Sequence, residues 1–346
     1  MKVLITGGTG DVGRATVERL AKNGYDVVVI GRRAGIEIPG AAYVQCDVAD
    51  YEDLVRVSKD CDAIIHLAAI RSPTDGTGPE IFAANCAGTY HVYEAAAANK
   101  IPRVVTASSI NAFGFFFGPV EFPLQYLPVD ERHPTHTTDP YSFSKEITER
   151  IGWYYWRRDG ISGAMLRLPA VHLSRERDKT LERLGALRKK VLELLSLPEA
   201  DQRALMHRVI DEGNRFRSSR PLEQKRDKPR ERGMYGEKDQ WSDEMFPRYW
   251  GMRANFFTGI DDRDSAESIE QSLTAQYDGA PEVFVHDDKN VLGVPSEALA
   301  RLFYPDVRER KTPFAADEAL ITVEKAKNLF GFSPRYSYAP ELAEMR

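Results

Sequence analysis

Tyr141 and Lys145 stand four residues apart in the stretch YSFSK. Side chains at this spacing are neighbours on an α-helix, so the two would face the same way. A phenol has a pKa of about 10 and must lose about three units to act as a base near pH 7. A lysine ammonium one turn away favours the phenolate and so lowers that pKa. The spacing suits proton transfer, but such pairs also occur by chance, so the chain must supply partners elsewhere.

Ser109 is one such partner. It ends the stretch PRVVTASS (102–109), whose β-branched run is typical of a buried parallel strand. Asp139 is a suitable cap for the helix that carries the tyrosine and the lysine. At the end of the strand, the Ser109 hydroxyl would hydrogen-bond a substrate oxygen and hold it against Tyr141. The sequence thus predicts a catalytic set of Ser109, Tyr141 and Lys145.

A glycine-rich turn lies near the start of the chain. The apolar run KVLIT (2–6) leads into GGTGDVG, and a helical pattern follows over residues 12–21. Gly7 would allow the tight turn, Gly10 a close approach to a pyrophosphate, and Gly13 close packing of helix on strand. The helix N-terminus would offer N–H donors to the phosphates. Strand, glycine turn and helix in this order predict a dinucleotide site, with an ordinary glycine loop as the alternative.

Arg32 and Arg33 follow the second predicted strand, YDVVVIG (25–31). An acidic residue at this point suits the ribose 2′-hydroxyl of NAD, whereas arginine suits the 2′-phosphate of NADP. Arg14, just beyond the glycine turn, would reach the same region. The sequence therefore favours NADP over NAD as the cofactor. The alternative is that the two arginines are a solvated surface pair.

Strands and helices alternate along the rest of the N-terminal half. Further elements are predicted as strands at 41–50, 62–69 and 102–109 and a helix at 80–100. This alternation predicts an α/β fold with a doubly wound parallel sheet of the Rossmann type, which binds ligands at the carboxyl ends of its strands. Asp47, at the end of one strand, would lie near the adenine amino group. His66, inside another strand, is expected to be structural.

Composition limits the class of protein. The 346 residues are 42% hydrophobic and 29% charged, which is typical of a soluble globular protein. The net charge of -5 offers no basic field to nucleic acid, and no apolar run reaches the roughly 20 residues of a membrane span. The N-terminus lacks the pattern of a signal peptide. We expect a cytoplasmic protein without a metal site, in which Cys46, Cys61 and Cys86 are reduced core thiols rather than a catalytic cysteine.

The stretch 174–250 is rich in lysine and arginine. Helices are predicted at 181–197 and 197–213, and a polar, proline-containing loop or lid at 218–240. Two interpretations stay open. The stretch is either a cap whose arginines bind an acidic or phosphorylated substrate, or a solvated helical hairpin. His207 within it is expected at the surface.

Taken together, these motifs resemble the extended short-chain dehydrogenases/reductases, also called the NAD-dependent epimerase/dehydratase family. The motifs are, in chain order, TGGTGDVG, CDVAD, HLAA, NCAGTYHVYEAA, TASS, PVDERHPTHTTDPYSFSK and LRLPAV. The resemblance fades and returns at FFTGIDDRDSAESI and KAKNLFGFSPRYS. It implies an NAD(P)-binding Rossmann domain at 1–173, a helical insertion at 174–250, and a smaller substrate lobe at 251–346, with a strand near 281–288 that returns to the Rossmann sheet.

The same resemblance implies roles for single residues. Ser109, Tyr141 and Lys145 would be the catalytic triad, and Asn85 would support the site from a helix. The expected cofactor-binding residues are Gly7, Gly10, Asp11, Val12, Gly13, Arg32, Arg33, Asp47, Val48, Leu67, Ala68, Ala69, Asn85, Tyr141, Lys145, Pro169 and Val171. The expected substrate-binding residues are Ile70, Ser109, Ile110, Asn111 and His172.

The resemblance also bears on the reaction. Dehydratases of the family carry acidic residues just after the strand serine, where this chain has Ile110 and Asn111, so dehydration is disfavoured. The run TASSINAFGFF is similar to uronate dehydrogenases, whereas sugar 4-epimerases often have a tyrosine where Phe113 stands. We expect an NAD(P)-dependent oxidoreductase acting on a secondary alcohol or ketone of a sugar or sugar-derived substrate. The alternatives are a nucleotide-sugar epimerase with tightly bound NAD and a non-catalytic dinucleotide sensor.

Two aromatic runs remain. The helices at 80–100 and 141–159 resemble those that pair two subunits in this family, so a homodimer is expected. The second helix would supply large apolar area from Trp153, Tyr154, Tyr155 and Trp156. The other run lies just past the catalytic strand and would form an apolar lip of the pocket or, as we favour, part of the core: Phe115, Phe116 and Phe117.

Overall fold

The computed structural model describes residues 1–219 and 240–344. In this part of the chain, seven parallel strands form one sheet in the order β3-β2-β1-β4-β5-β6-β9. They are β1 (Lys2–Thr6), β2 (Asp26–Gly31), β3 (Ala42–Gln45), β4 (Ala63–His66), β5 (Val104–Ala107), β6 (Met165–Arg167) and β9 (Glu282–Phe284). The strand order reverses beside β1, so the predicted doubly wound Rossmann sheet is confirmed. The strand predicted near 281–288 is β9, which pairs with β6.

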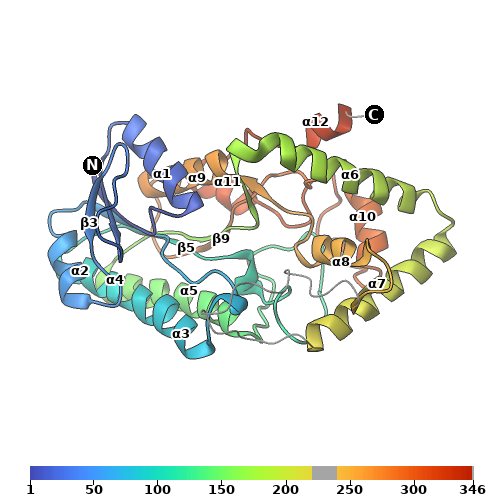
Figure 1. The fold of residues 1–346 in the computed structure, drawn as a ribbon, viewed down its shortest axis with the longest axis horizontal. Coiled ribbons are helices and arrows are strands. Elements are labelled where there is room, and N and C mark those ends of the chain that lie inside the picture. The colour runs from blue at the N-terminus through green and yellow to red at the C-terminus, as the bar shows by residue number, and fades with distance from the viewer. Residues whose placement is uncertain (220–239, 345–346) are drawn as a thin grey trace.

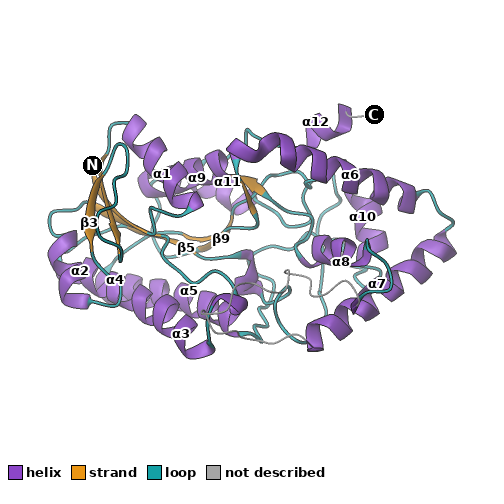
Figure 2. Ribbon diagram, viewed as in Figure 1, coloured by secondary structure: helices purple, strands orange, loops and turns teal. Residues whose placement is uncertain are grey.

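Helices cover both faces of this sheet (Figure 1; Figure 2). One layer contains α1 (Asp11–Lys22), α9 (Asp262–Thr274) and α11 (Glu324–Phe330), and the other contains α2 (Tyr51–Ser58), α4 (Gly88–Ala98) and α5 (Pro140–Asp159). Successive residues of a strand point to opposite faces. In β1, Val3 and Ile5 accordingly join the core under the first layer and Leu4 the core under the second. Burial on both faces explains why these strands read as continuous apolar runs.

The helix predicted at 80–100 is interrupted. It consists of α3 (Gly78–Phe82), a π-helical turn (Ala83–Ala87) and α4. Thr77 and Glu80 form a capping box at its start. The π turn adds a residue to the helix at Asn85, whose side chain points into the site described below. Such turns often mark functional sites, and this interruption leaves no periodic signal in the sequence.

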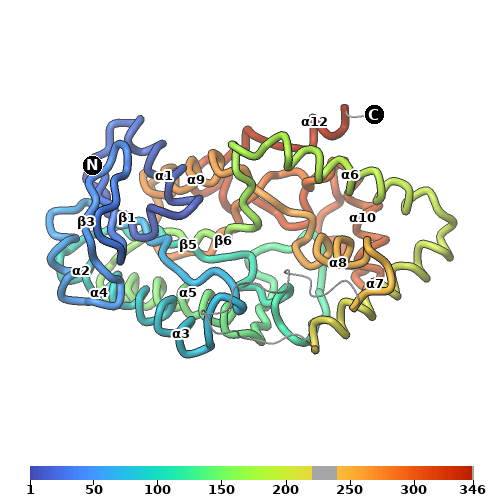
Figure 3. Tube along the Cα trace, in the orientation of Figure 1, coloured from blue at the N-terminus to red at the C-terminus, as the bar shows by residue number. Residues whose placement is uncertain are grey.

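A second, helical lobe lies beside the sheet domain (Figure 3). Its helices are α6 (Arg177–Leu195), α7 (Glu199–Ser219), α8 (Phe246–Ala254), α10 (Ser296–Phe303) and α12 (Ala339–Glu344). Two short strands, β7 (Val171–His172) and β8 (Ile260–Asp261), pair in parallel where the chain passes between the two parts. Across the described residues, no helix has both the length and the apolar character needed to cross a membrane.

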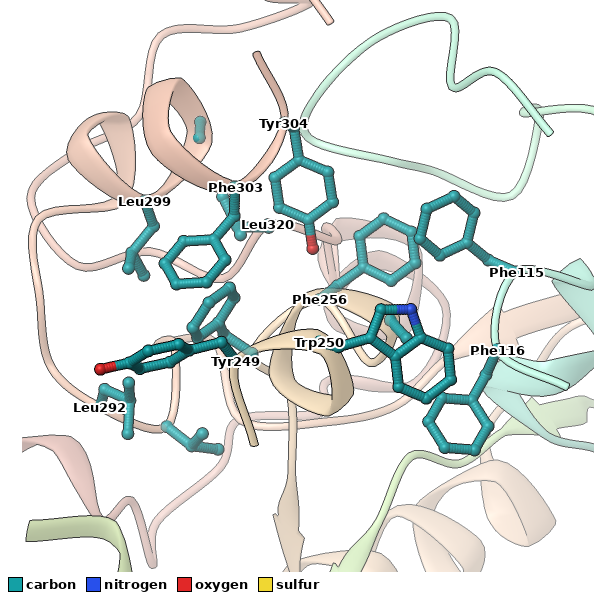
Figure 4. Packing of buried hydrophobic residues seen from close by; sticks show 14 of the residues in the cluster. Phe115, Phe116, Tyr249, Trp250, Phe256, Leu292, Leu299, Phe303, Tyr304 and Leu320 are labelled. Carbon is teal, nitrogen blue, oxygen red and sulfur yellow. The ribbon is translucent and has the colours of Figure 1, made fainter. Parts of the chain in front are cut away.

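The core of this lobe is aromatic (Figure 4). The ring of Trp250 lies 5.6 Å from that of Phe116, and Phe256 stacks on Tyr304 at 5.6 Å. Phe115, Phe116 and Phe117 are 2–6% exposed and belong to this cluster, so the core interpretation of these three residues is confirmed.

The predicted insertion contributes to the same core. Its helices at 181–197 and 197–213 are observed as α6 and α7, and Leu184, Leu187 and Val191 are buried in the aromatic cluster. This segment is therefore more than a solvated hairpin, although His207 is exposed as predicted. The loop predicted at 218–240 lies almost entirely outside the described residues. The predicted boundary at residue 250 falls within α8, and the three-part division of the chain remains a proposal.

Candidate active site

Two glycines of the turn have no room for a side chain. Gly7 has φ +72°, and a Cβ added to it would lie 2.7 Å from the backbone nitrogen of Ala68. A Cβ on Gly13 would lie 2.3 Å from the carbonyl oxygen of Gly7. Both contacts are far closer than atoms tolerate, so the β1 turn and the packing of α1 both require glycine. This is the arrangement that the sequence predicts.

Gly10 differs from these two, because it borders open space. It is the N-cap of α1, it supplies no side-chain hydrogen bond, and an added Cβ would meet only the Gly7 carbonyl oxygen, at 3.4 Å. Asp11 and Val12 follow it, partly buried, in the first turn. An uncapped helix start with open space before it fits a phosphate group, which backbone N–H donors bind. The turn therefore suits the predicted dinucleotide.

Thr6 ties the first strand to the loop after β4. Its hydroxyl accepts hydrogen bonds from the N–H groups of Leu67 and Ala68, at 3.2 and 3.1 Å, and lies 2.7 Å from Nδ1 of His66. Nε2 of His66 lies 3.0 Å from the hydroxyl of Thr89. Burial lowers the pKa of His66 to about 3, so the ring is neutral. His66 is structural, as predicted, and it contacts the same Thr6 hydroxyl that holds the backbone of Leu67 and Ala68.

The predicted adenosine side of the site lies at the ends of β2 and β3. Arg32 and Arg33 have exposed side chains. Their carbonyl oxygens accept hydrogen bonds from Gln45 and Tyr43, which fix the backbone while leaving the guanidinium groups in solvent. Asp47 turns the chain by accepting a hydrogen bond from the N–H of Ala49 at 3.0 Å. These positions fit the predicted roles, which remain predictions.

Asp47 is followed by Val48, which faces the helix layer. An added Cβ on Gly88 would lie 3.0 Å from the Val48 side chain, so α4 packs closely against this loop. The Val48 carbonyl oxygen also lies 3.1 Å from Nδ1 of His91. Its backbone is thereby held at the edge of the predicted cofactor site.

Helix α5 begins as the sequence predicts. The Asp139 carboxylate accepts a hydrogen bond from the Ser142 N–H at 2.9 Å, with Pro140 in the first turn. Tyr141 and Lys145 follow and are 6% and 5% exposed. Nζ of Lys145 donates a 2.7 Å hydrogen bond to the carbonyl oxygen of Ala107, the last residue of β5. The structure thus brings the helix pair to the strand end that leads to Ser109.

Ser109 caps the short 3₁₀ turn η3 (Ile110–Phe113). Its hydroxyl accepts the N–H of Asn111 at 3.1 Å, and its interaction with Tyr141 lowers the pKa of the phenol. Ile110 is buried, and its N–H donates to the carbonyl oxygen of Leu168 at 2.9 Å. The three predicted catalytic residues therefore converge, and Ile110 and Asn111 border them.

The ionisation of Tyr141 differs from the expectation. The spacing of Tyr141 and Lys145 predicts a lowered pKa, but burial raises the pKa of Tyr141 to about 12 and outweighs the lowering effects of Ser109 and of the Arg71 charge. Burial also lowers the pKa of Lys145 to about 8, against the raising effect of Cys86 and Glu149. Desolvation disfavours the charged form of both groups. In the state described, the phenol is protonated and suited to act as an acid.

Asn85 braces the site from the π turn. Its Oδ1 accepts the N–H of Ile70 at 2.7 Å, and its Nδ2 donates at 2.9 Å to both the carbonyl oxygen of Ile70 and the hydroxyl of Ser144. These bonds tie the loop after β4 to α5, one residue before Lys145. Asn85 therefore has the supporting position that was expected, while direct contact with a cofactor remains a prediction.

The segment after β6 carries three of the predicted site residues. Pro169 and Val171 are partly buried near the carboxyl end of β6. The ring of His172 packs edge-on against Tyr338 at 5.2 Å, and burial lowers its pKa to about 4. His172 thus packs against the C-terminal segment, and its role in substrate binding remains a prediction.

Two groups of charged residues near the site are not predicted from the sequence. Arg175 donates a 3.1 Å hydrogen bond to Asp11, and Arg71 lies 3.8 Å from the same carboxylate. Beneath the triad, Glu149 accepts hydrogen bonds from Ser108 and Arg167. A signal existed for the second group, because an arginine inside the apolar strand MLR needs a buried partner. No sequence signal points to the contacts of Arg71 and Arg175 with Asp11, because these residues are distant in the chain.

Sheet order and glycine turn define a Rossmann-like fold, and comparison with known proteins identifies the family. The chain belongs to the NAD-dependent epimerase/dehydratase family, whose model matches residues 3–202. A putative UDP-glucose 4-epimerase of Methanocaldococcus jannaschii is 32% identical over 185 residues, which are 51% of this chain and 58% of that protein. A uronate dehydrogenase of Pseudomonas putida is 30% identical over 171 residues, 48% of this chain and 60% of that protein. The matches thus span about three fifths of these relatives.

Among solved structures, the chain resembles MoeE5 in complex with UDP-glucuronic acid and NAD. The TM-score is 0.60 at 19% identity, covering 99% of this chain and 97% of that one. At this identity the likeness supports the fold. The resemblance to extended short-chain dehydrogenases/reductases is confirmed, including the similarity to uronate dehydrogenases and sugar 4-epimerases.

Proposed function

We propose that this protein is an NAD(P)-dependent oxidoreductase that interconverts a secondary alcohol and a ketone on a sugar or sugar-derived substrate. The observation that carries the proposal is the convergence of Ser109, Tyr141 and Lys145 on the end of β5. When bound, the nicotinamide supplies or accepts the hydride. Tyr141 transfers the proton at the substrate oxygen, Ser109 orients that oxygen, and Lys145 binds the nicotinamide ribose and stabilises the phenolate.

Two arginines support an acidic or phosphorylated substrate. Arg71 and Arg175 are 75% and 59% exposed and meet at Asp11, beside the glycine turn. The charge of Arg71 also reaches Tyr141, because it lowers the pKa of that phenol. Guanidinium groups bind carboxylates and phosphates through paired hydrogen bonds. An anionic group on the substrate would be held between the proton donor and the cofactor.

NADP is the cofactor that we propose in preference to NAD, because Arg32 and Arg33 are exposed where the 2′-phosphate would lie. A cytoplasmic location is also proposed. It is supported by the three free, buried cysteines, which a reducing compartment would preserve.

A homodimer is part of the proposal, with a corrected surface. Of the four aromatic residues expected to form it, Tyr155 is fully buried within the chain, and the indole groups of Trp153 and Trp156 donate to Glu282 and Asp278. Tyr154 remains, 42% exposed. It is joined by other exposed aromatic residues of α3, α4 and α5, namely Phe82, Tyr90 and Phe143. These helices lie along one side of the molecule (Figure 1).

The second candidate is a nucleotide-sugar epimerase that returns the hydride to the other face of the same carbon. The match to a protein named as a putative UDP-glucose 4-epimerase favours it. Against it, Phe113 is fully buried among Phe115, Phe122 and His133, so this position offers no hydroxyl to a sugar.

Mass spectrometry of the nucleotide released on denaturing dialysed protein separates the two candidates. An empty protein that then binds NADP more tightly than NAD and oxidises acidic sugars supports the oxidoreductase. Near-stoichiometric retained NAD supports the epimerase, because such an enzyme recycles its cofactor in place. That outcome would also contradict the argument from Arg32 and Arg33.

A further inference from the structure

A buried carboxylate lies directly behind the catalytic set. Arg167, in β6, donates to Glu149 through two parallel hydrogen bonds of 2.8 Å, one to each carboxylate oxygen. The two side chains are 3% and 4% exposed. The hydroxyl of Ser108 donates a third hydrogen bond of 2.6 Å to the same carboxylate. Glu149 is thus shared by three elements: α5, β6 and the segment after β5.

The position of Glu149 along α5 gives this contact its meaning. Glu149 comes four residues after Lys145, so it extends the same face of the helix. Lys145 holds the carbonyl oxygen of Ala107, and Glu149 holds the hydroxyl of Ser108. Two consecutive residues at the end of β5 are therefore fastened to successive turns of α5. Ser109 is the next residue, and its position relative to Tyr141 depends on both contacts.

The charge of the Glu149 carboxylate provides a second link to the catalytic set. Lys145 is buried, and Glu149 is one of the two groups that favour its ammonium form. Arg167 offsets part of the carboxylate charge, and its ion pair is bidentate and sealed from solvent. Removing the carboxylate would leave two buried cations on neighbouring elements.

We propose that Glu149 is a positioning residue, which sets Ser109 through Ser108 and stabilises the Lys145 ammonium through its charge. The inference rests on the proposed function for its catalytic readout. A purely structural ion pair would stabilise the fold without affecting the chemistry. The two roles differ in what happens when one contact is removed at a time.

Ser108→Ala removes the link to Ser109 and leaves the Glu149–Arg167 pair intact. We expect kcat to fall about tenfold or more, because small displacements of reacting groups are costly. The KM and the dinucleotide Kd should stay within about twofold of wild type. Thr148→Ala is the matched control, since Thr148 is buried on the same helix and bonds only to the Ser144 carbonyl oxygen among the hydrogen bonds described. Equal kcat values for Ser108→Ala, Thr148→Ala and wild type would overturn the positioning role.

Glu149→Gln keeps the size of the side chain and removes its charge. The test is the rate at which cyanate carbamoylates Lys145, measured by peptide mass spectrometry across pH and normalised to exposed Lys59. Cyanate attacks the neutral amine, so the carbamoylation rate of Lys145 rises as the lysine loses its proton. The pH at the midpoint of this rise should be about one unit lower in Glu149→Gln than in wild type. An unchanged midpoint would overturn the electrostatic role. This readout needs no substrate, so a wild type that turns over no sugar would contradict the proposed function alone. If Glu149→Gln does not fold, Ser108→Ala decides the proposal.

Discussion

The Lys145 ammonium and the Ala107 carbonyl oxygen are joined by a 2.7 Å hydrogen bond, buried between α5 and the end of β5. A charged donor makes such a bond stronger than a neutral one. It fixes the helix that carries Tyr141 to the strand that leads to Ser109. This contact joins two adjoining elements of the Rossmann domain and so sets much of the catalytic geometry.

Tyr141→Phe should abolish most turnover without harming the fold. The substitution keeps the ring, which packs edge-on against Phe117 at 5.6 Å, and removes only the hydroxyl. We expect kcat to fall about 10²–10⁴-fold, the usual contribution of a general acid or base. Absorbance of the reduced nicotinamide measures the rate, and thermal unfolding checks the fold. The control is Tyr93→Phe, which removes another buried phenol, and an active Tyr141→Phe would refute the assignment.

The reduction reaction should lose activity above about pH 8. Burial lowers the pKa of Lys145 to about 8, while the pKa of Tyr141 is about 12. The Tyr141 phenol therefore keeps its proton at the pH at which the lysine loses its charge. A neutral lysine no longer stabilises the phenolate that forms as Tyr141 gives up its proton. A profile of kcat/KM against pH should show this limb. In Lys145→Arg the positive charge persists, so the fall in kcat/KM should occur at higher pH. A fall at the same pH as in wild type would contradict the argument.

Stability should respond to the same lysine in the opposite sense. The pKa of Lys145 is about 8 in the folded protein and has its ordinary value of 10.5 in the unfolded chain. Between these values the unfolded state binds more protons, so this group makes the free energy of unfolding rise with pH across the window. Urea titrations at pH 7.5 and 10 test this. Lys145→Met should lack this rise, and an equal rise in both proteins would assign it to other groups.

Local patterns made much of the site predictable. Gly7, Gly10 and Gly13 lie within seven residues of each other, and Tyr141 and Lys145 within one helical turn, so spacing alone fixes their relation. The sheet followed from the alternation of apolar runs with helical patterns. In each case the deciding interaction is short in sequence.

The remaining features of the site depend on contacts between residues that are distant in the chain, which sequence spacing does not predict. Ser108, Glu149 and Arg167 meet across 41 and 18 residues. The raised pKa of Tyr141 follows from burial, which the lobe and the loops create together. The π turn lies where the Asn85 side chain contacts both Ile70 and Ser144. None of these features has a periodic signature.

Substitution of two glycines of the turn should have different effects, one on the stability of the fold and the other on dinucleotide binding. Gly13→Ala places a Cβ 2.3 Å from the Gly7 carbonyl oxygen and should destabilise the fold by about 1–3 kcal/mol. Gly10→Ala meets nothing closer than 3.4 Å, so it should fold normally while projecting a methyl group towards the bound phosphate. Its dinucleotide Kd should rise about tenfold or more. Calorimetry and fluorescence titration separate the two effects, and normal binding by Gly10→Ala would place the phosphates elsewhere.

Arg32→Ala with Arg33→Ala should reverse the cofactor preference. Both guanidinium groups are in solvent at the end of β2, where a charge-assisted bond to a 2′-phosphate costs no buried contact. We expect the Kd for NADP to rise about tenfold or more, with the Kd for NAD nearly unchanged. Arg56→Ala on α2 removes an exposed arginine outside the site and should alter neither constant. Equal effects on both cofactors would show that the pair acts only through general charge.

Tyr154→Glu should convert the proposed dimer to a monomer. Tyr154 and Tyr90 are 42% and 40% exposed, and their rings stack at 6.5 Å on the outer side of α4 and α5. Exposed aromatic side chains grouped on one face are typical of a surface that another molecule covers. A carboxylate there would replace apolar ring area and would lose its hydration on association, which is unfavourable even with the Arg158 guanidinium close by. Sedimentation velocity at micromolar concentration measures the change, with Leu197→Glu as the control because Leu197 is equally exposed on the other lobe. A wild type that sediments only as a monomer would refute the dimer, whereas a dimer that survives Tyr154→Glu would place its interface on another face.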